Sequence, residues 1–269
     1  MADFPLGDHF FIEVAGVDTS TSSGTAVTSG NGVKGSWTEI IASTSSNSTF
    51  LILEFNESLA GVLRDFLIDI GVGAAASEQV LVADIQQQSK SDFNNGQFFY
   101  IPVQLASGTR LSIRTQTNSA ATDARFIIYL FSGTFQSSSG YAKTTAYGLS
   151  GEDGTAVDPG GTANTKGSWT EITASTSERI NEMTILVSGN TNGAQANGTA
   201  LYDVAIGGSG SEVIILENLY AASSSFEVSK ASINIKQKIP AGTRIAIRMQ
   251  STITDATDRV FSFSVNGVS

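Results

Sequence analysis

Apolar and polar residues alternate in two stretches of the chain that are near copies of each other. In 110–116, Leu111 and Ile113 alternate with arginine, serine and glutamine. In 244–250, isoleucines and a methionine alternate with arginine, alanine and glutamine in the same way. Alternation with a period of two is typical of a β-strand that has one face in a core. Each stretch follows a Gly-Thr turn, so we expect a turn and a half-buried strand, used twice.

The distance between these copies recurs along the chain. Gly108 and Gly242 are 134 positions apart (242 − 108), and the same offset relates Asp69 to Asp203 and Arg125 to Arg259. The segment Lys-Gly-Ser-Trp-Thr-Glu-Ile occurs at 34–40 and again at 166–172. Self-similarity with a period of about half the chain indicates an internal duplication.

The composition favours an all-β fold. The chain of 269 residues has 27 glycines, 4 prolines and 15% charged residues, which fits short strands separated by small-residue turns. We therefore predict two tandem antiparallel β-sandwich domains of jelly-roll-like form. We expect an N-terminal extension or docking arm at 1–23, the first domain at 24–136, a linker at 137–150 and the second domain at 151–269.

The only two tryptophans, Trp37 and Trp169, occupy equivalent places in the two copies. A tryptophan buries a large apolar area at the edge of a sandwich while its N–H finds a partner. We interpret both as core aromatics. The alternative is a ring that stacks on a glycan.

The last strand distinguishes the two copies. In 126–131 both faces are apolar, whereas 260–265 alternates with serine. With the 134-residue offset, Phe126, Ile128 and Leu130 align with Val260, Ser262 and Ser264. Contiguous exposed apolar patches mark contacts, so these three residues are our candidate interface.

Six arginines recur in the duplication, and on one strand Arg110 and Arg114 share a face. Guanidinium groups in such a pattern bind carboxylates, either on a neighbouring strand or in an anionic ligand. We favour structural ion pairs, with an anionic-ligand or acidic-glycan site as the alternative. The six residues are Arg110, Arg114, Arg125, Arg244, Arg248 and Arg259.

Several chemistries have little support in the sequence. There is no cysteine, His9 is the single histidine, and the net charge is −10. A Ser/His/Asp triad and a histidine-based metal site are therefore not expected, and neither is binding to nucleic acid. Asp255 and Asp258 could hold calcium, but they lack the spacing of a calcium loop. We predict no enzyme activity, no metal and no cofactor.

The N-terminal residues lack the basic start and apolar core of a signal peptide, and no apolar run reaches the length of a membrane helix. We therefore expect synthesis in the cytoplasm and no membrane insertion.

Two motifs carry a family resemblance. The run FLIDIGVGAAASEQVL at 66–81 and the run IPAGTRIAIRMQS at 239–251 resemble the strand-loop and turn-strand motifs of tailed-bacteriophage virion proteins with tandem jelly-roll-like domains. The resemblance covers both halves, but these motifs are structural and name no active site.

The resemblance implies a structural component of a virion, in the tail, a fibre, or a head-accessory or decoration protein. Other virion proteins and further copies of the same chain are then its expected partners. A carbohydrate-binding module that recognises host surface glycans is the alternative function, and a glycan hydrolase is a third.

Overall fold

The computed structural model describes residues 11–57, 64–89, 97–118, 123–132, 143–189, 198–224, 227–228, 232–252 and 261–269. These residues form strands joined by turns and loops, and no helix long and apolar enough to span a membrane is found among them. The chain divides into two compact units. Unit 1 comprises Met1–Val62, Ile68–Ala83 and Ser91–Thr144, and unit 2 comprises Leu63–Leu67, Asp84–Lys90 and Thr145–Ser269.

Most strands of each unit come from one repeat. The strands of the first repeat are β1 (Phe11–Ala15), β2 (Val17–Asp18), β3 (Ser23–Thr28), β4 (Gly30–Asn31), β5 (Thr38–Ile41), β6 (Phe50–Glu57), β7 (Arg64–Val72), β8 (Gln79–Ser89), β9 (Gln97–Ile101), β10 (Leu111–Thr117) and β11 (Asp123–Ser132). The strands of the second are β12 (Thr144–Tyr147), β13 (Leu149–Ser150), β14 (Asp153–Val157), β15 (Thr170–Thr173), β16 (Glu182–Gly189), β17 (Gly198–Ile206), β18 (Val213–Ser224), β19 (Glu227–Val228), β20 (Ser232–Ile235), β21 (Ile245–Ser251) and β22 (Phe261–Val268).

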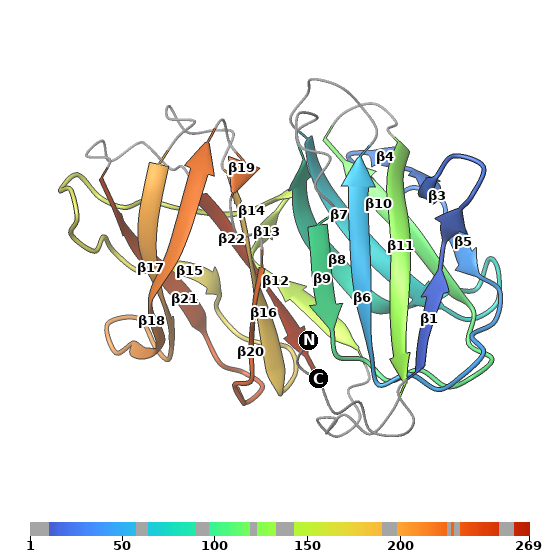
Figure 1. Cartoon of the computed structure of the whole chain (residues 1–269). Coiled ribbons are helices and arrows are strands. Elements are labelled where there is room, and N and C mark those ends of the chain that lie inside the picture. Colours follow the sequence, from blue (N-terminus) through green and yellow to red (C-terminus); the bar gives the residue numbers. More distant parts are fainter. Residues whose placement is uncertain are drawn as a thin grey trace, which may run out of the picture. The chain divides into compact units, whose positions relative to one another are not determined.

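The strand orders are those of a jelly roll. In the first repeat one sheet runs β3-β11-β6-β9 and the other contains β5-β10-β7-β8. In the second repeat the corresponding orders are β14-β22-β16-β20 and β15-β21-β17-β18. Figure 1 shows β1, β11, β6 and β9 side by side in one layer of unit 1. The predicted fold class, two jelly-roll-like β-sandwiches from a duplication, is confirmed.

The core of each unit consists of the inward-facing residues of both sheets. In unit 2 the ring of Tyr202 on β17 lies 4.9 Å from that of Phe263 on β22, and both side chains are fully buried. In unit 1, Phe126, the equivalent of Phe263, lies 5.4 Å from Phe55 on the neighbouring strand β6. The alternating strand β10 buries Leu111 and Ile113, as β21 buries Ile245 and Ile247.

Part of the expected N-terminal arm is a strand of the sandwich. β1 pairs antiparallel with β11 from Phe11↔Ser132 to Ala15↔Ile128. The segment expected as a linker at 137–150 contains β12 and β13, which are the equivalents of β1 and β2 in the second repeat. Gly16 and Gly148 both have positive φ, and a Cβ on either would approach the carbonyl of the last strand, at Phe126 and Phe263 respectively. Residues 1–10 and 133–142 lie outside the described part of the chain.

The boundary between the two units does not coincide with the boundary between the repeats at one end of the β7–β8 pair. Leu63–Leu67 and Asp84–Lys90 belong to the first repeat by sequence but to unit 2 by contacts. The reason is a set of buried hydrogen bonds from Gln86 and Gln88 to β16 and β22. A division at the expected linker would cut through these bonds.

Candidate functional site

The recurring arginines of unit 1 lie on the outer face of the β10-β7 sheet, where one carboxylate gathers two cations. Asp69 on β7 accepts from Lys34 Nζ at 2.7 Å and from Arg114 Nε at 2.8 Å. Its side chain is 3% exposed. The Arg114 guanidinium lies over the Trp37 ring, 4.5 Å from the ring centroid. Charge pairing and cation–π contact therefore fix one arginine between two neighbours.

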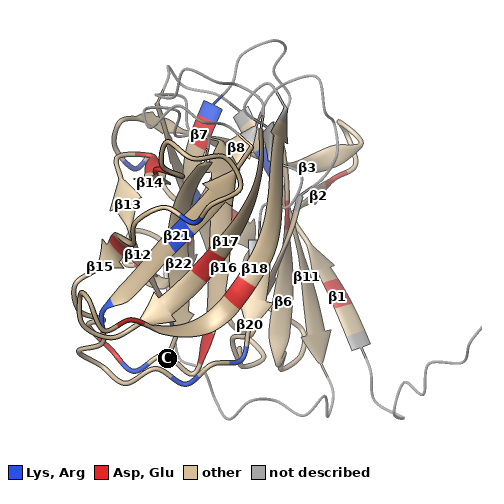
Figure 2. Ribbon diagram, turned by 90° about the vertical axis from the view of Figure 1, so that its left-hand side faces the viewer, with Lys and Arg blue, Asp and Glu red and all other residues tan. Residues whose placement is uncertain are grey.

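Unit 2 repeats this cluster with nearly the same distances. Asp203 on β17 accepts from Lys166 Nζ at 2.6 Å and from Arg248 Nε at 2.9 Å. Arg248 lies 4.5 Å over Trp169. The backbone N–H of Asn218 also donates to Asp203 at 2.9 Å. Burial by itself raises the pKa of Asp203, but Lys166, the Asn218 N–H and Arg248 together hold that pKa below its usual value. In Figure 2 the red band on β17 beside a blue band on β21 marks this pairing of charges.

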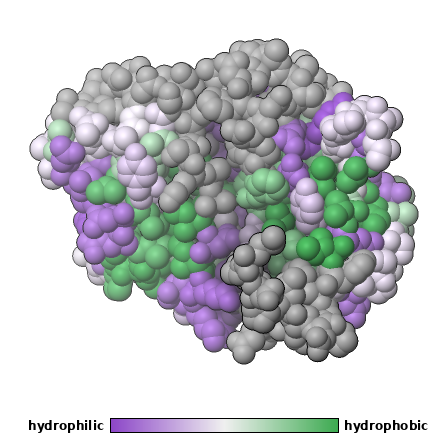
Figure 3. Space-filling view, viewed as in Figure 1, coloured by the Kyte–Doolittle hydropathy of each residue, from purple (hydrophilic) through white to green (hydrophobic). Residues whose placement is uncertain are grey.

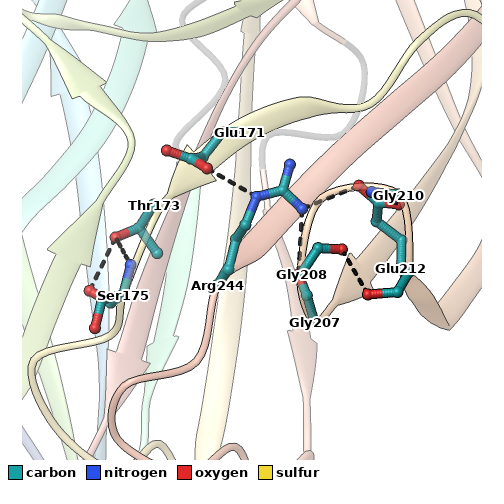
Figure 4. A network of polar contacts seen from close by, with 9 residues as sticks. Glu171, Thr173, Ser175, Gly207, Gly208, Gly210, Glu212 and Arg244 are labelled. Carbon is teal, nitrogen blue, oxygen red and sulfur yellow. Dashed lines mark hydrogen bonds and ion pairs between the residues drawn. The ribbon is translucent and has the colours of Figure 1, made fainter.

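The arginine that follows the Gly-Thr turn of each repeat joins a neighbouring strand to the loop between the two middle strands. Arg244 donates from Nε to Glu171 at 2.7 Å, and from Nη1 to Glu212 at 3.1 Å and to the Gly207 carbonyl at 3.2 Å. Figure 4 shows these three contacts around one guanidinium group. Gly207 has φ +105°, a conformation that glycine adopts without strain, which places its carbonyl within reach of the arginine.

In unit 1 the β7–β8 loop is held in the same way by Arg110, which contacts Glu39 at 2.7 Å, Glu78 at 2.9 Å and the Gly73 carbonyl at 3.1 Å. Hydrogen bonds to Glu39 and Glu78 raise the pKa of Arg110. Burial raises the pKa of Glu78, but its backbone hydrogen bonds and Arg110 outweigh burial and lower it.

These geometries decide what the arginines do chemically. The four arginines of β10, β21 and their preceding turns each donate Nε to a carboxylate of their own unit. An anionic ligand that took the Nε donor would have to displace one of those carboxylates, and at Arg114 and Arg248 a tryptophan ring also lies against the guanidinium. The arrangement therefore supports a structural role. Arg125 donates to Thr21, Ser23 and the Gly24 carbonyl.

The other residues singled out from the sequence lie outside the described residues: Arg259, His9, Asp255 and Asp258. Within the described part of the chain, no group of three or more metal-ligating side chains comes together.

The tryptophans are not core residues. Trp37 and Trp169 are half-buried, and each lies against an arginine on the polar face of the sheet. On the other side of Trp37 the backbone of Gly71 packs so closely that an added Cβ would be 2.7 Å from the ring. The rings are held in place by the arginine, so the expectation of core aromatics is corrected to aromatics of the charged face.

The candidate interface residues are also corrected. Phe126, Ile128 and Leu130 are 0–2% exposed and point into the core of unit 1. The structure aligns the last strands differently from the 134-residue offset. Thr25 pairs with Phe126 and Thr155 pairs with Phe263, and an added Cβ on Gly24 or Gly154 would meet the backbone of the same two phenylalanines.

Phe126 is therefore equivalent to Phe263, which is 137 positions away (263 − 126), three more than expected. A shift by an odd number of residues exchanges the two faces of a strand. The inward residues of β11 correspond to Phe263 and Val265, and the outward ones, Ile127 and Tyr129, correspond to Ser264 and Asn266.

The apolar face that opens to the outside of unit 1 is thus formed by the other set of residues. We call it the apolar sheet face, and it consists of apolar outward residues of β1, β11, β6 and β9: Ile12, Val14, Phe50, Ile52, Phe98, Tyr100, Ile127, Tyr129 and Phe131. Glu54, between Ile127 and Phe98, is a charged residue within this face. Phe98 is 57% exposed, Val14 is 46% exposed and Ile12 is 45% exposed. Figure 3 shows green side chains on this face, over β11 and β1.

Aromatic rings line the middle of the apolar sheet face. Phe50 stacks on Phe131 at 4.4 Å and lies 5.0 Å from Tyr100. The Tyr129 hydroxyl donates to Glu54 at 2.6 Å, and this bond, with burial, raises the pKa of Tyr129 to about 12. The sequence shows that 126–131 is apolar on both faces, but the 134-residue offset assigned the wrong face to the outside.

Comparison with known proteins identifies no family. No protein-family model matches the chain, and no curated protein matches it. Among solved structures, PNGF-II aligns with 96% of the chain at 9% identity and a TM-score of 0.39, and the chain spans 65% of the length of PNGF-II.

Two further structures have similar values. The tandem CBM22 domains of Paenibacillus barcinonensis Xyn10C align over 97% of this chain and 90% of their own, with 9% identity and a TM-score of 0.27. A putative secreted protein from Parabacteroides distasonis aligns over 96% and 88%, with 9% identity and a TM-score of 0.23. None of the three reaches a TM-score of 0.5, and we therefore base the function on the chain's own side chains.

Proposed function

We propose that the chain is a non-enzymatic structural protein that assembles in several copies through the apolar sheet face of unit 1. The observation that carries this proposal is the face itself. Folded monomers seldom leave a large contiguous apolar patch in water, and such patches mark sites of protein contact. Here two pairs of large apolar side chains, Ile12 and Val14 on β1 and Phe98 and Tyr100 on β9, are each 37–57% exposed on either side of β11 and β6.

The setting we propose is the virion of a tailed bacteriophage, as a tail, fibre or head-accessory component. It is supported by the resemblance of the 66–81 and 239–251 motifs to virion proteins. In the structure both motifs hold the sandwich together: Asp69 and Arg248 lie in the ion-pair clusters, and Gly242 has the positive φ of the turn. Motifs that serve packing alone fit a structural protein.

Light scattering after size-exclusion chromatography tests the association. Wild-type chain is expected to increase in mass with concentration, and Phe98→Ser is expected to weaken that increase. Val33→Ser is the matched control, because Val33 is 65% exposed but lies in a loop outside the apolar sheet face. A wild-type chain that stays monomeric at every concentration would contradict association, and absence of the chain from purified particles would contradict the virion setting.

A second candidate function, binding of host surface glycans, is favoured by the rings of Phe50, Tyr100 and Phe131, which cluster on the same face. Aromatic rings at a surface provide platforms for flat apolar ligand faces. Specific ligand sites also need converging polar groups, and Ile12 and Val14 continue the face with aliphatic side chains instead. A glycan array probed at high protein concentration tests this candidate, and a complete lack of binding would remove it.

A further inference from the structure

The apolar sheet face has a structural equivalent in unit 2, and there the equivalent face is covered. Gln86, near the end of β8, donates from Nε2 to Ser188 Oγ at 2.7 Å and accepts from Ser264 Oγ at 2.8 Å. Gln88 forms two bonds with Gly189, one in each direction, at 2.8 and 3.0 Å. Ser188 and Ser264, the partners of Gln86, are buried, and so is Asn266 on the same face. The end of the β7–β8 pair thus lies on the outside of the β16-β22 sheet.

The second repeat has its own copy of this strand end. β17 and β18 correspond to β7 and β8 with an offset of 134 (203 − 69), and both copies contain a non-glycine residue with positive φ at the same place, Asp84 (50°) and Asn218 (55°). With this register Tyr220 is equivalent to Gln86, and Ala222 to Gln88. Gln86 is 2% exposed, whereas Tyr220 is 49% exposed. Tyr220 on β18 is therefore open to solvent at the place where Gln86 on β8 is covered.

The two uncovered surfaces differ from the covered pair in the same chemical direction. On the sheet side, Ser264 and Asn266 of β22 are replaced in unit 1 by Ile127 and Tyr129 of β11, whereas Ser188 and Leu186 of β16 are replaced by Asn56 and Glu54 of β6. On the strand-end side, Gln86 and Gln88 are replaced by Tyr220 and Ala222, and their cross-strand neighbours are Leu201 and Thr199. Apolar groups thus replace polar ones on β11 and at Tyr220 and Ala222, while β6 keeps polar groups at Glu54 and Asn56. Matched apolar surfaces bury favourably against each other.

We propose that the β17–β18 end of one copy of the chain docks on the apolar sheet face of a second copy, in the way that the β7–β8 end docks on β16 and β22 within unit 2. In this contact Tyr220 lies against Ile127 and Asn56 of the neighbouring copy, the equivalents of Ser264 and Ser188, with Tyr129 next to Ile127 on the same face. The contact joins two different surfaces, so it is heterologous, and repetition of it produces either a closed ring or a fibre. This inference rests on the proposed function, for which it names the partner and the surface.

The test uses two variants that each lose one surface. The sheet variant carries Ile127→Ser and Tyr129→Asn, which are the residues found at the equivalent places in unit 2, so the fold is expected to tolerate them. The strand-end variant carries Tyr220→Ser. Val213→Ser serves as its control, because Val213 is 60% exposed at the opposite end of β18. Circular dichroism verifies folding, and Ile127→Ser alone and Tyr220→Gln are the replacements if either variant fails to fold.

The mass of each variant is measured by light scattering, alone and in an equimolar mixture. We expect each variant alone to associate roughly tenfold or more weakly than wild type, and the mixture to form a 1:1 dimer that grows no further, since one intact contact remains. Wild-type behaviour of Tyr220→Ser, or a mixture that stays monomeric, would overturn the head-to-tail contact while leaving association through the apolar sheet face standing. A monomeric wild type would overturn both proposals.

Discussion

The carboxyl groups of Asp65 and Asp153 lie next to each other in unit 2, where burial, followed by the charge of Asp153, raises the pKa of Asp65 to about 8. Burial raises the pKa of Asp153 as well. Asp65 is 1% exposed and accepts a hydrogen bond from Gln88 at 2.9 Å. This acidic pair therefore sits directly behind the glutamine that fixes the β7–β8 end on unit 2.

Unit 2 is expected to lose stability as the pH rises from about 4 to about 8. In this window the folded chain keeps a proton on Asp65 that the unfolded chain, with the ordinary pKa of 3.8, has already lost. The free energy of unfolding then falls by up to about 1.4 kcal/mol for each pH unit, and the decline ends above the folded-state pKa. Asp65→Asn keeps an oxygen that accepts from Gln88 but removes the titratable carboxyl group. The free energy of unfolding of this variant should therefore depend less on pH.

Tryptophan fluorescence can isolate this effect. In a Trp37→Phe background the remaining tryptophan, Trp169, reports on unit 2 alone. Urea unfolding at pH 5 and pH 8, with and without Asp65→Asn, gives the four free energies that are needed. Identical pH dependence in both backgrounds would show that Asp65 does not carry the proton.

Two adjacent residues on β11 are expected to respond differently to the same substitution. Ile128→Ser places a hydroxyl in the core of unit 1, where Ile128 is 0% exposed, and should cost about 3–5 kcal/mol in the free energy of unfolding. Ile127→Ser changes a half-buried outward residue and should cost about 1 kcal/mol or less. Fluorescence of Trp37 in a Trp169→Phe background measures both. Equal costs would contradict the assignment of the two faces.

The sandwich could be predicted from the sequence because its strongest signals are local. The alternation at 110–116 and its copy at 244–250 give strand, face and duplication together, and the structure buries the expected Leu111, Ile113, Ile245 and Ile247. Local periodicity suffices here because each strand has one face in a core.

The faces of the last strand could not be predicted, because register depends on loop length. Between β10 and β11 the first repeat is three residues shorter than the second is between β21 and β22, as the equivalence of Phe126 with Phe263 requires. The chance similarity of Thr-Asp-Ala-Arg before Phe126 to Thr-Asp-Arg before Val260 hid this difference. An alignment error of an odd number of residues assigns every side chain of a strand to the wrong face. For this reason the candidate interface was assigned to core residues instead of surface residues.

The packing of the β7–β8 end against β16 and β22 could not be predicted from the sequence either. Gln86, Gln87 and Gln88 form a polar run on an otherwise apolar strand, and sequence alone does not show which residues a buried glutamine will meet. The structure shows that Gln86 bonds to Ser188 and Ser264 and that Gln88 bonds to Gly189.

The aspartate of each ion-pair cluster is expected to be more important for stability than the exposed glutamate near it. Asp203→Ala leaves Lys166 and Arg248 without their shared carboxylate and should cost about 2–4 kcal/mol. Glu171→Ala removes a side chain that is 49% exposed, and should cost under about 1 kcal/mol. Thermal unfolding of both variants compares them directly, and a larger loss for Glu171→Ala would contradict the ranking of the two carboxylates.

Substitution of Gly154 is expected to destabilise unit 2 because a side chain at this position would clash with the backbone of β22. Its φ is not in the left-handed region, but a Cβ built on it would lie 2.6–2.8 Å from backbone atoms of Phe263. Because these are backbone atoms of a paired strand, they can move only if β14 and β22 separate. Gly154→Ala should therefore cost about 2–4 kcal/mol.

The control for that substitution is Gly208→Ala in the same unit. There the added Cβ would meet only the Ser211 hydroxyl, at 3.2 Å, and a side chain on an exposed turn can rotate away. Gly208→Ala should change the free energy of unfolding by about 0.5 kcal/mol or less. Urea unfolding followed by Trp169 fluorescence measures both variants under one condition. If Gly154→Ala were as stable as Gly208→Ala, β14 would have to lie farther from β22 than the structure places it, and the alignment of Phe126 with Phe263 would lose its support.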